Sequence, residues 1–194
     1  MVTVDGVRMP TANAVVLVRH GRTKLNQEGR LRGRLDPELD LEGRREVAFL
    51  ARSLAACNIT KIISSPLQRA RQTAVAIDQM HHTGIHLDAR LIDRDYGEYA
   101  GAKKSDVVNE FGSLDNAPGV EPAESVRSRV LELLNESAGA LSDGLTVLVS
   151  HDVVNTFLLT ELGEQEGQIA QHTACWNLIS RRDNAWHVVA TNHR

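Results

Sequence analysis

Several features that define other protein classes are scarce in this 194-residue sequence. Only two cysteines occur, Cys57 and Cys175, which argues against a disulfide framework and makes a cytoplasmic location the expectation. Apolar runs such as residues 14–18 are far shorter than the roughly 18 residues that span a membrane. Polar Thr3, Asp5 and Arg8 interrupt the N-terminal segment, so a signal peptide is not expected. With a net charge of -3 the chain is not a generally basic nucleic-acid binder.

The positive charge that is present is unevenly distributed. Residues 19–34 contain six basic side chains and one acid, Glu28, and residues 61–72 contain three basic side chains and no acid. Arginine outnumbers lysine 18 to 4, which a coding bias would explain. A local anion site would explain it as well, because a guanidinium group pairs with phosphate oxygens. Composition leaves both interpretations open.

Alternating apolar segments predict an α/β fold. Residues 14–19, 61–64 and 145–150 are short runs rich in β-branched residues, typical of strands buried on both faces. Two further strands are expected at 175–181 and 186–191, joined by a turn at Asp183-Asn184. Residues 1–13 are expected to form an irregular lead-in.

Helices are expected between these strands. Asp40 can cap a helix whose apolar positions 47, 50, 51 and 54 repeat at helical spacing. Ser65-Pro66 is interpreted as a helix start with serine at the cap, and further helices are expected from Pro122 and over 152–162. We therefore expect a three-layer α/β/α sandwich with a mainly parallel central sheet. One domain over residues 1–194 is expected, in which the glycine-rich residues 81–120 form a cap of loops and short helices over one sheet edge.

Polar residues follow the three buried strands directly. Arg19 and His20 end the first, Arg69 lies just after the second, and His151 ends the third. Ligands of a parallel sheet bind beyond the carboxyl ends of its strands, so these four side chains are expected to meet. Helix N-termini begin nearby and favour an anion.

This chemistry suits phosphoryl transfer. Arginines can neutralise the phosphate oxygens, and a neutral imidazole is a nucleophile near pH 7. Gly21 would let the backbone come close to the phosphate. The three-histidine stretch 81–86 is interpreted as a solvated loop, and no metal or cofactor is expected. The three arginines within residues 30–34 either extend the phosphate field or face solvent.

A set of ordered motifs makes a family resemblance plain. In chain order they are LVRHGRTKLN (17–26), GRLDPELDLEG (33–43), SSPLQRARQTA (64–74), LIDRDYGEYAG (91–101), AES (123–125) and VSHD (149–152). Together they resemble the histidine phosphatase superfamily, in the branch that contains the cofactor-dependent phosphoglycerate mutases. The resemblance implies a phosphoglycerate mutase-like fold.

The resemblance also implies roles for individual residues. His20 would be the nucleophile and become phosphohistidine, while Arg19, Arg69 and His151 would hold the phosphoryl oxygens. Gly21, Thr23 and Asn26 would contact the substrate, Asn26 through its amide. Asp93 stands at the position of the family's general acid, which would protonate the leaving oxygen and then activate water.

Two positions depart from the family pattern. Asp93 replaces a glutamate and is shorter by one methylene, about 1.5 Å of reach, which matters for catalytic geometry. Glu98, Glu124 or Asp152 could supply the proton instead. Asp152 follows the second histidine where many relatives have glycine, and a related branch uses an aspartate there as its acid.

The expected function is hydrolysis of a phosphomonoester of a small metabolite. A mutase of the phosphoglycerate type is the first alternative, but such mutases carry a longer basic insertion, and residues 101–124 offer only Lys103 and Lys104. A catalytically degenerate phospho-ligand binder is the second, supported only by the Asp93 substitution. The expected partner is a phosphorylated small molecule rather than nucleic acid or membrane. A homodimer is the commonest symmetric assembly and the expectation for any oligomer.

Overall fold

The computed structural model describes residues 2–139, 144–165 and 169–194. A six-stranded sheet in the order β5-β4-β6-β3-β7-β8 forms its centre. Its strands are β3 (Ala14–Arg19), β4 (Ile59–Ser64), β5 (Ile85–Leu87), β6 (Leu145–Ser150), β7 (Trp176–Arg182) and β8 (Ala185–His193). The first four strands in the sheet order run parallel, and β7 and β8 each run antiparallel to their neighbour. The mainly parallel sheet is thus confirmed.

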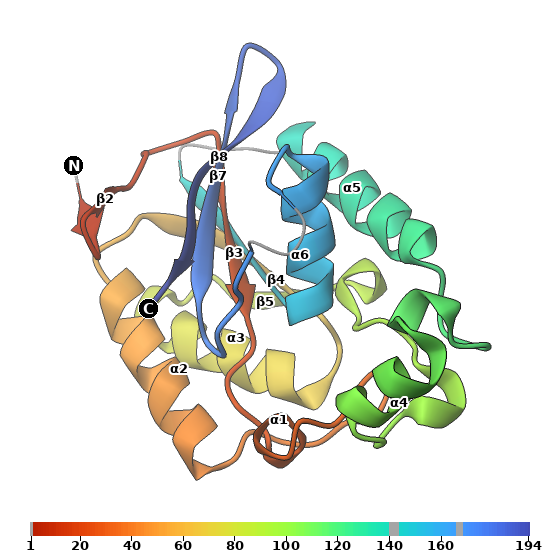
Figure 1. Ribbon diagram of the computed structural model, residues 1–194. Helices are drawn as coiled ribbons and strands as arrows, with labels where there is room; N and C mark the ends of the chain where they lie inside the picture. The colour runs from red at the N-terminus through yellow and green to blue at the C-terminus, as the bar shows by residue number, and fades with distance from the viewer. Residues whose placement is uncertain (1, 140–143, 166–168) are drawn as a thin grey trace.

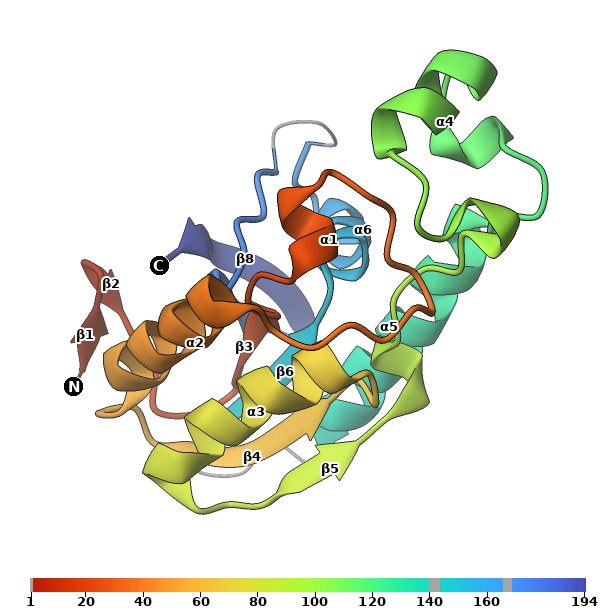
Figure 2. The ribbon, with the colours of Figure 1, turned by 90° about the horizontal axis from the view of Figure 1, so that it is seen from below.

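Helices cover both faces of this sheet (Figures 1 and 2). On one side lie α2 (Leu41–Leu54) and α3 (Gln68–His81), and on the other α5 (Ala123–Gly139) and α6 (Asp152–Glu161). Alternate residues of β3 belong to different cores, because Val16 packs in the cluster with α2 and α3 and Leu17 in the cluster with α5 and α6. Every residue of β3 is buried, which explains its continuous apolar sequence. The expected three-layer sandwich is present.

Two local features follow the sequence signals closely. The Asp40 carboxylate accepts the Gly43 N–H at 2.7 Å and caps α2, as its position predicted. Asp183 and Asn184 have φ angles of 50° and 63° in the β7–β8 turn. Asparagine and aspartate tolerate this left-handed conformation better than other residues with a side chain, so the turn forms where predicted.

Two sequence interpretations were wrong. The irregular lead-in instead contains an antiparallel hairpin of β1 (Thr3–Val4) and β2 (Val7–Arg8), because the buried Val4 anchors it to the core beside α2 and α3. Helix α3 begins at Gln68 with Leu67 as its N-cap, not with Ser65. The Ser65 hydroxyl bonds to His151 instead, which places it in the site described below.

The segment 81–120 is built mainly of short helices and connecting loops and also contains one strand. It contains short helices η1 (Ala89–Leu91), η2 (Gly97–Tyr99) and η3 (Leu114–Asn116), and one longer helix, α4 (Lys104–Phe111). Figure 2 shows α4 standing away from the sheet. The unexpected element is β5, which pairs with β4 and forms the sheet edge. A small separate core that includes Leu31, Tyr96 and Val107 holds the cap together.

No helix in the described part of the chain is long and apolar enough to cross a membrane. The same residues contain no group of three or more histidine, cysteine or acidic side chains placed to hold a metal ion.

Candidate active site

The carboxyl ends of three neighbouring strands bring the predicted residues together. Backbone hydrogen bonds extend the parallel pairing one residue past the strands, from His20 N to Ser150 O at 3.0 Å and from Ser65 N to Val149 O at 2.9 Å. As a result the rings of His20 and His151 lie 5.1 Å apart between centroids. Both imidazoles are fully buried. The convergence expected from the topology of a parallel sheet is present.

His20 is held in one tautomer. Its Nδ1 lies 2.6 Å from the carbonyl oxygen of Gly21, and a carbonyl only accepts, so Nδ1 carries the proton. The lone pair is therefore on Nε2, which is buried and makes no hydrogen bond within the described residues. Burial, reinforced by Arg69 and Arg19, holds the pKa of His20 well below its usual value. The imidazole is thus neutral near pH 7, with Nε2 available as a nucleophile.

Gly21 is required by its packing against α2. A Cβ atom at this position would lie 2.6 Å from Val47 Cγ1 and 2.7 Å from the carbonyl oxygen of Gly43. Its N–H donates to Thr73 Oγ1 at 3.1 Å, so α3 also fixes this turn. The glycine lets the His20 turn lie directly on α2. Its predicted role in admitting a phosphate stays a prediction.

Arg69 and Asp93 form a fully buried ion pair. Arg69 Nη2 lies 2.8 Å from Asp93 Oδ2, and neither side chain has exposed area. The guanidinium also donates to the carbonyl oxygens of Leu35 at 2.8 Å and Gly33 at 3.0 Å. Arg69 is therefore fixed by the 33–35 loop and by the acid, while its Nε has no partner among the described residues.

Asp93 also faces His151. The distance from Asp93 Oδ2 to His151 Nδ1 is 3.8 Å, and the opposite ring nitrogen lies 2.9 Å from Ser65 Oγ. Burial raises the pKa of Asp93 despite the opposing charge of Arg69. Burial also lowers the pKa of His151, and the positive Arg69 lowers it further, so this ring is neutral as well. A raised pKa shifts this carboxyl group toward the protonated form that a general acid needs.

The surroundings of Asp152 shift its pKa in the direction opposite to that of Asp93. Its Oδ2 lies 3.2 Å from Arg19 Nη2 and 3.2 Å from Arg32 Nη2. Although burial opposes ionisation, these two guanidinium groups hold the pKa of Asp152 well below its usual range. Asp152 is therefore ionised and a poor proton donor. Glu98 and Glu124 are exposed, whereas the acid position at Asp93 is buried beside the histidines.

Thr23 and Asn26 form a reciprocal cap on α1 (Lys24–Gln27). Asn26 Oδ1 accepts from Thr23 N at 3.0 Å and from Thr23 Oγ1 at 2.8 Å. Asn26 N in turn lies 3.3 Å from Thr23 Oγ1. The Asn26 amide oxygen is thus committed to the cap, and only its Nδ2 is left to donate to a substrate. Thr23 is fully buried, and the structure gives it a capping position.

Besides Ser65, two residues of the site were not assigned from sequence. Arg32 was left between two interpretations, and it lies against Asp152 with 11% of its side chain exposed. Gln171 offers its backbone carbonyl to Arg19. The sequence could not have identified Gln171, because this residue acts through its backbone carbonyl, which every residue has. Arg32 could have been favoured only from its place in the arginine-rich loop.

Five buried nitrogen atoms of these residues have no hydrogen-bond partner in the described ranges. They are Arg19 Nε, His20 Nε2, Arg32 Nε, Arg69 Nε and His151 Nδ1. Buried polar atoms are normally paired, so a group of unpaired ones in one place needs an explanation. A bound phosphoryl group explains it, since its oxygens accept from the three guanidinium Nε–H groups while the lone pair of His20 Nε2 faces the phosphorus atom.

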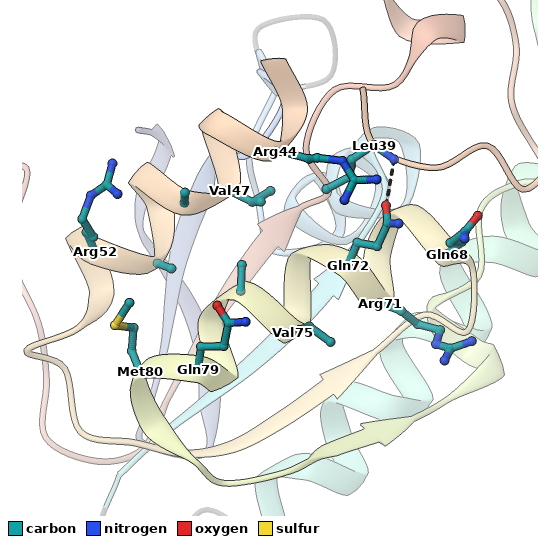
Figure 3. A pocket seen from close by; sticks show the side chains of 13 residues that line it. Leu39, Arg44, Val47, Arg52, Gln68, Arg71, Gln72, Val75, Gln79 and Met80 are labelled. Carbon is teal, nitrogen blue, oxygen red and sulfur yellow. Dashed lines mark hydrogen bonds between the residues drawn. The ribbon is translucent and has the colours of Figure 1, made fainter. Parts of the chain in front are cut away.

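Two concavities near these elements differ in chemistry. One, of about 370 Å³, is bordered by Arg32, Asp152, Tyr96 and Gln171. It therefore adjoins the buried residues of the site, because Asp152 contacts Arg19. The other, about 650 Å³, lies between α2 and α3 (Figure 3). Its wall has arginines, glutamines and apolar side chains but no acid, histidine or cysteine among the residues described. The smaller concavity is therefore the candidate entrance to the site.

Comparison with known proteins gives a consistent result. The family model described as "Histidine phosphatase superfamily (branch 1)" matches residues 15–194. Phosphoserine phosphatase 1 of Hydrogenobacter thermophilus is 31% identical over 149 residues, 72% of this chain and 71% of that protein. A 2,3-bisphosphoglycerate-dependent phosphoglycerate mutase of Thermoplasma acidophilum is 29% identical, covering 78% of each chain. The solved structure titled "Mycobacterial hydrolase 1" superposes with a TM-score of 0.85 at 25% identity, over 94% of this chain and 99% of its own.

Proposed function

This chain belongs to the histidine phosphatase superfamily, and from that premise we propose how its residues divide the work of hydrolysing a phosphomonoester. His20 is the nucleophile, Asp93 is the acid and then the base, and Arg19, Arg69 and His151 hold the phosphoryl group. The observation that carries the proposal is the state of His20: neutral, with Nδ1 bonded to Gly21 and Nε2 unpaired beside two arginines.

The first step transfers the phosphoryl group to the enzyme. His20 Nε2 attacks phosphorus, the bond from phosphorus to the ester oxygen breaks, and Asp93 gives its proton to that oxygen as the alcohol leaves. The Gly21 carbonyl stabilises the positive charge that develops on the ring, because it accepts from Nδ1–H. Arg19 and Arg69 balance the charge on the phosphoryl oxygens.

The second step returns the enzyme to its starting state. The Asp93 carboxylate, now ionised, takes a proton from water as the water oxygen attacks phosphorus. The Nε2–phosphorus bond breaks, and inorganic phosphate leaves. Asp93 then holds a proton again, ready for the next ester. His151 lies beside this carboxyl group, with 3.8 Å between Nδ1 and Asp93 Oδ2.

The charge of the site supports a dianionic substrate. Arg19, Arg32 and Arg69 carry three positive charges, and ionised Asp152 carries one negative charge. With Asp93 protonated the remaining charge of two balances a phosphomonoester dianion. The concavity at Arg32 and Asp152 would take the leaving alcohol. Its volume of about 370 Å³ suits a small metabolite.

The mutase alternative rests on the similarity to the phosphoglycerate mutase of Thermoplasma acidophilum. It predicts interconversion of 2- and 3-phosphoglycerate without release of phosphate. Against it, residues 101–124 contain only two basic side chains, Lys103 and Lys104, where the mutase pattern implies a longer basic insertion.

Three further expectations belong to this proposal. We propose that the chain works as one domain over residues 1–194 and in the cytoplasm, where its two unpaired cysteines would stay reduced. A homodimer is proposed on the general prevalence of two-fold assemblies.

The test is phosphate release from a panel of phosphorylated metabolites, with His20→Ala beside the parent protein. The matched control is His86→Ala, which removes an exposed histidine from β5. The proposal expects turnover of at least one phosphomonoester by the parent and the control, and none above background by His20→Ala. Unchanged turnover in His20→Ala would refute it. A phosphohistidine that forms at His20 but never hydrolyses would instead identify a degenerate binder.

A further inference from the structure

Asp152 is more exposed than the charged and histidine side chains of the catalytic cluster, by which we mean Arg19, Arg69, Asp93 and His151. The side chains of Arg69, Asp93 and His151 have no exposed area, whereas 33% of the Asp152 side chain is exposed. Asp152 also borders the concavity of about 370 Å³ that adjoins the cluster. A phosphate entering from this side reaches Asp152 before it reaches the histidines.

The carboxylate of Asp152 is bound as an anion would be bound. Its Oδ2 lies 3.2 Å from one terminal nitrogen each of Arg19 and Arg32. Its Oδ1 accepts the Val153 N–H at 2.7 Å, in the first turn of α6. Two guanidinium groups and a helix N-terminus are the donors that proteins use for phosphate. Here a side chain of the protein occupies them.

The second terminal nitrogen of each arginine is committed elsewhere. Arg19 Nη1 donates to the carbonyl of Gln171, and Arg32 Nη1 donates to the carbonyl of Arg30 at 3.1 Å. Both guanidinium groups therefore stay in place when Asp152 moves, and only the donors that face Asp152 become available. Phosphate and the Asp152 carboxylate therefore compete for the Nη2 atoms of Arg19 and Arg32, while the unpaired Nε atoms are open to phosphate in either case.

We propose that Asp152 is an internal counter-anion, which the phosphate of the substrate displaces from Arg19 and Arg32 and which returns as inorganic phosphate leaves. This inference rests on the proposed function, because it takes Arg19 as a phosphate ligand. It makes Asp152 a positioning residue that weakens the binding of free phosphate and limits product inhibition. It differs from the role of general acid, in which Asp152 would exchange a proton and leave phosphate affinity unaltered.

The experiment compares Asp152→Asn and Asp152→Gly with the parent protein in two measurements. The first is the dissociation constant of inorganic phosphate by calorimetry, with orthovanadate inhibition as a second probe. The second is the pre-steady-state rate of phosphorylation at saturating glycerol 3-phosphate. The control is Asp106→Asn, an exposed first-turn aspartate of α4 with no arginine partner among the described residues.

Removal of the competing carboxylate should tighten phosphate and vanadate binding about tenfold or more, the size of one charge-assisted hydrogen bond. KM should fall with it, while the phosphorylation rate stays within about threefold, and Asp106→Asn should match the parent. The asparagine keeps the shape of Asp152 and the glycine removes the side chain, so agreement between two folded variants excludes an artefact of either.

Two results would overturn the inference. One is unchanged or weaker phosphate binding in both variants, and the other is loss of the phosphorylation rate by about a hundredfold or more, as expected for a general acid. If the parent binds neither phosphate nor vanadate and releases no phosphate from any ester, the proposed function itself has failed. Turnover by the parent with equal phosphate affinity in all variants rejects only the role of Asp152.

Discussion

Asp93→Asn separates the proton-donor role of Asp93 from its structural role. Positioned general acids contribute about 10²- to 10⁴-fold to rate, or roughly 3–5 kcal/mol of barrier. We expect that loss for an alkyl ester such as glycerol 3-phosphate, whose alkoxide needs a proton to leave. For p-nitrophenyl phosphate the loss in the phosphorylation step should be below about tenfold, because nitrophenolate leaves without one.

The same substitution has a structural cost that can be worked from the contacts. Asp93 Oδ1 accepts from Arg94 N at 2.9 Å and Oδ2 from Arg69 Nη2 at 2.8 Å. An asparagine has one acceptor oxygen, so one of these buried donors loses its partner, at about 1–3 kcal/mol of stability. This cost falls equally on both substrates, and the ratio of the two rates cancels it.

The assay is single-turnover release of glycerol and of p-nitrophenol at saturating enzyme. Glu98→Gln, in the same loop but exposed, is the control and should leave both rates within about twofold. An equal loss with both substrates in Asp93→Asn would refute the assignment of Asp93 as the acid. The same selective loss in Asp152→Asn would transfer the role to Asp152.

Three other outcomes follow from the contacts. Arg69→Gln removes the guanidinium donors to Asp93 and to the carbonyl oxygens of Leu35 and Gly33, and because buried acceptors then lose their partner it should lower the free energy of unfolding by about 1–3 kcal/mol in urea titrations. Arg71→Gln, on the exposed side of the same helix, should change it by less than about 0.5 kcal/mol. Gly43→Ala would bring a Cβ into collision with the backbone oxygen of Arg22, so it should cost about 1–3 kcal/mol of stability and reduce turnover. Because the pKa of His20 is lowered, kcat/KM should not fall as pH drops through 6.5, its unperturbed pKa, and a loss centred there would contradict a buried neutral nucleophile.

Local sequence rules predicted the central strands β3, β4 and β6 well because these strands are largely buried on both faces. The six residues of β3 are all apolar except the last, and nothing but a central strand fits that pattern. The capping aspartate of α2 and the β7–β8 turn could also be predicted from the sequence, since each depends on one or two adjacent residues. Once the strands were known, the topology of a parallel sheet was enough to predict that Arg19, His20 and His151 meet.

Features that depend on tertiary contacts could not be predicted from the sequence. Residues 3–8 have no strong strand pattern, and their hairpin forms because Val4 and Met9 are buried in the core of the domain. Ser65 looked like a helix cap, but its hydroxyl bonds to a histidine 86 positions away. The pairing of Asp152 with Arg32 spans 120 positions and leaves no periodic trace in the sequence. Such long-range polar contacts decide which carboxylate is ionised.

The central claim is that His20 Nε2 becomes phosphorylated, and trapping the intermediate tests it most directly. The protein would be quenched in alkali within milliseconds of mixing with phosphate-labelled substrate, digested, and the labelled position read by mass spectrometry and ³¹P NMR. The account predicts an acid-labile, alkali-stable phosphate on His20 at Nε2, because Nδ1 is bonded to the Gly21 carbonyl. Phosphate on Nδ1, on His151 or on any other residue, or steady-state turnover with no labelled histidine, would contradict it.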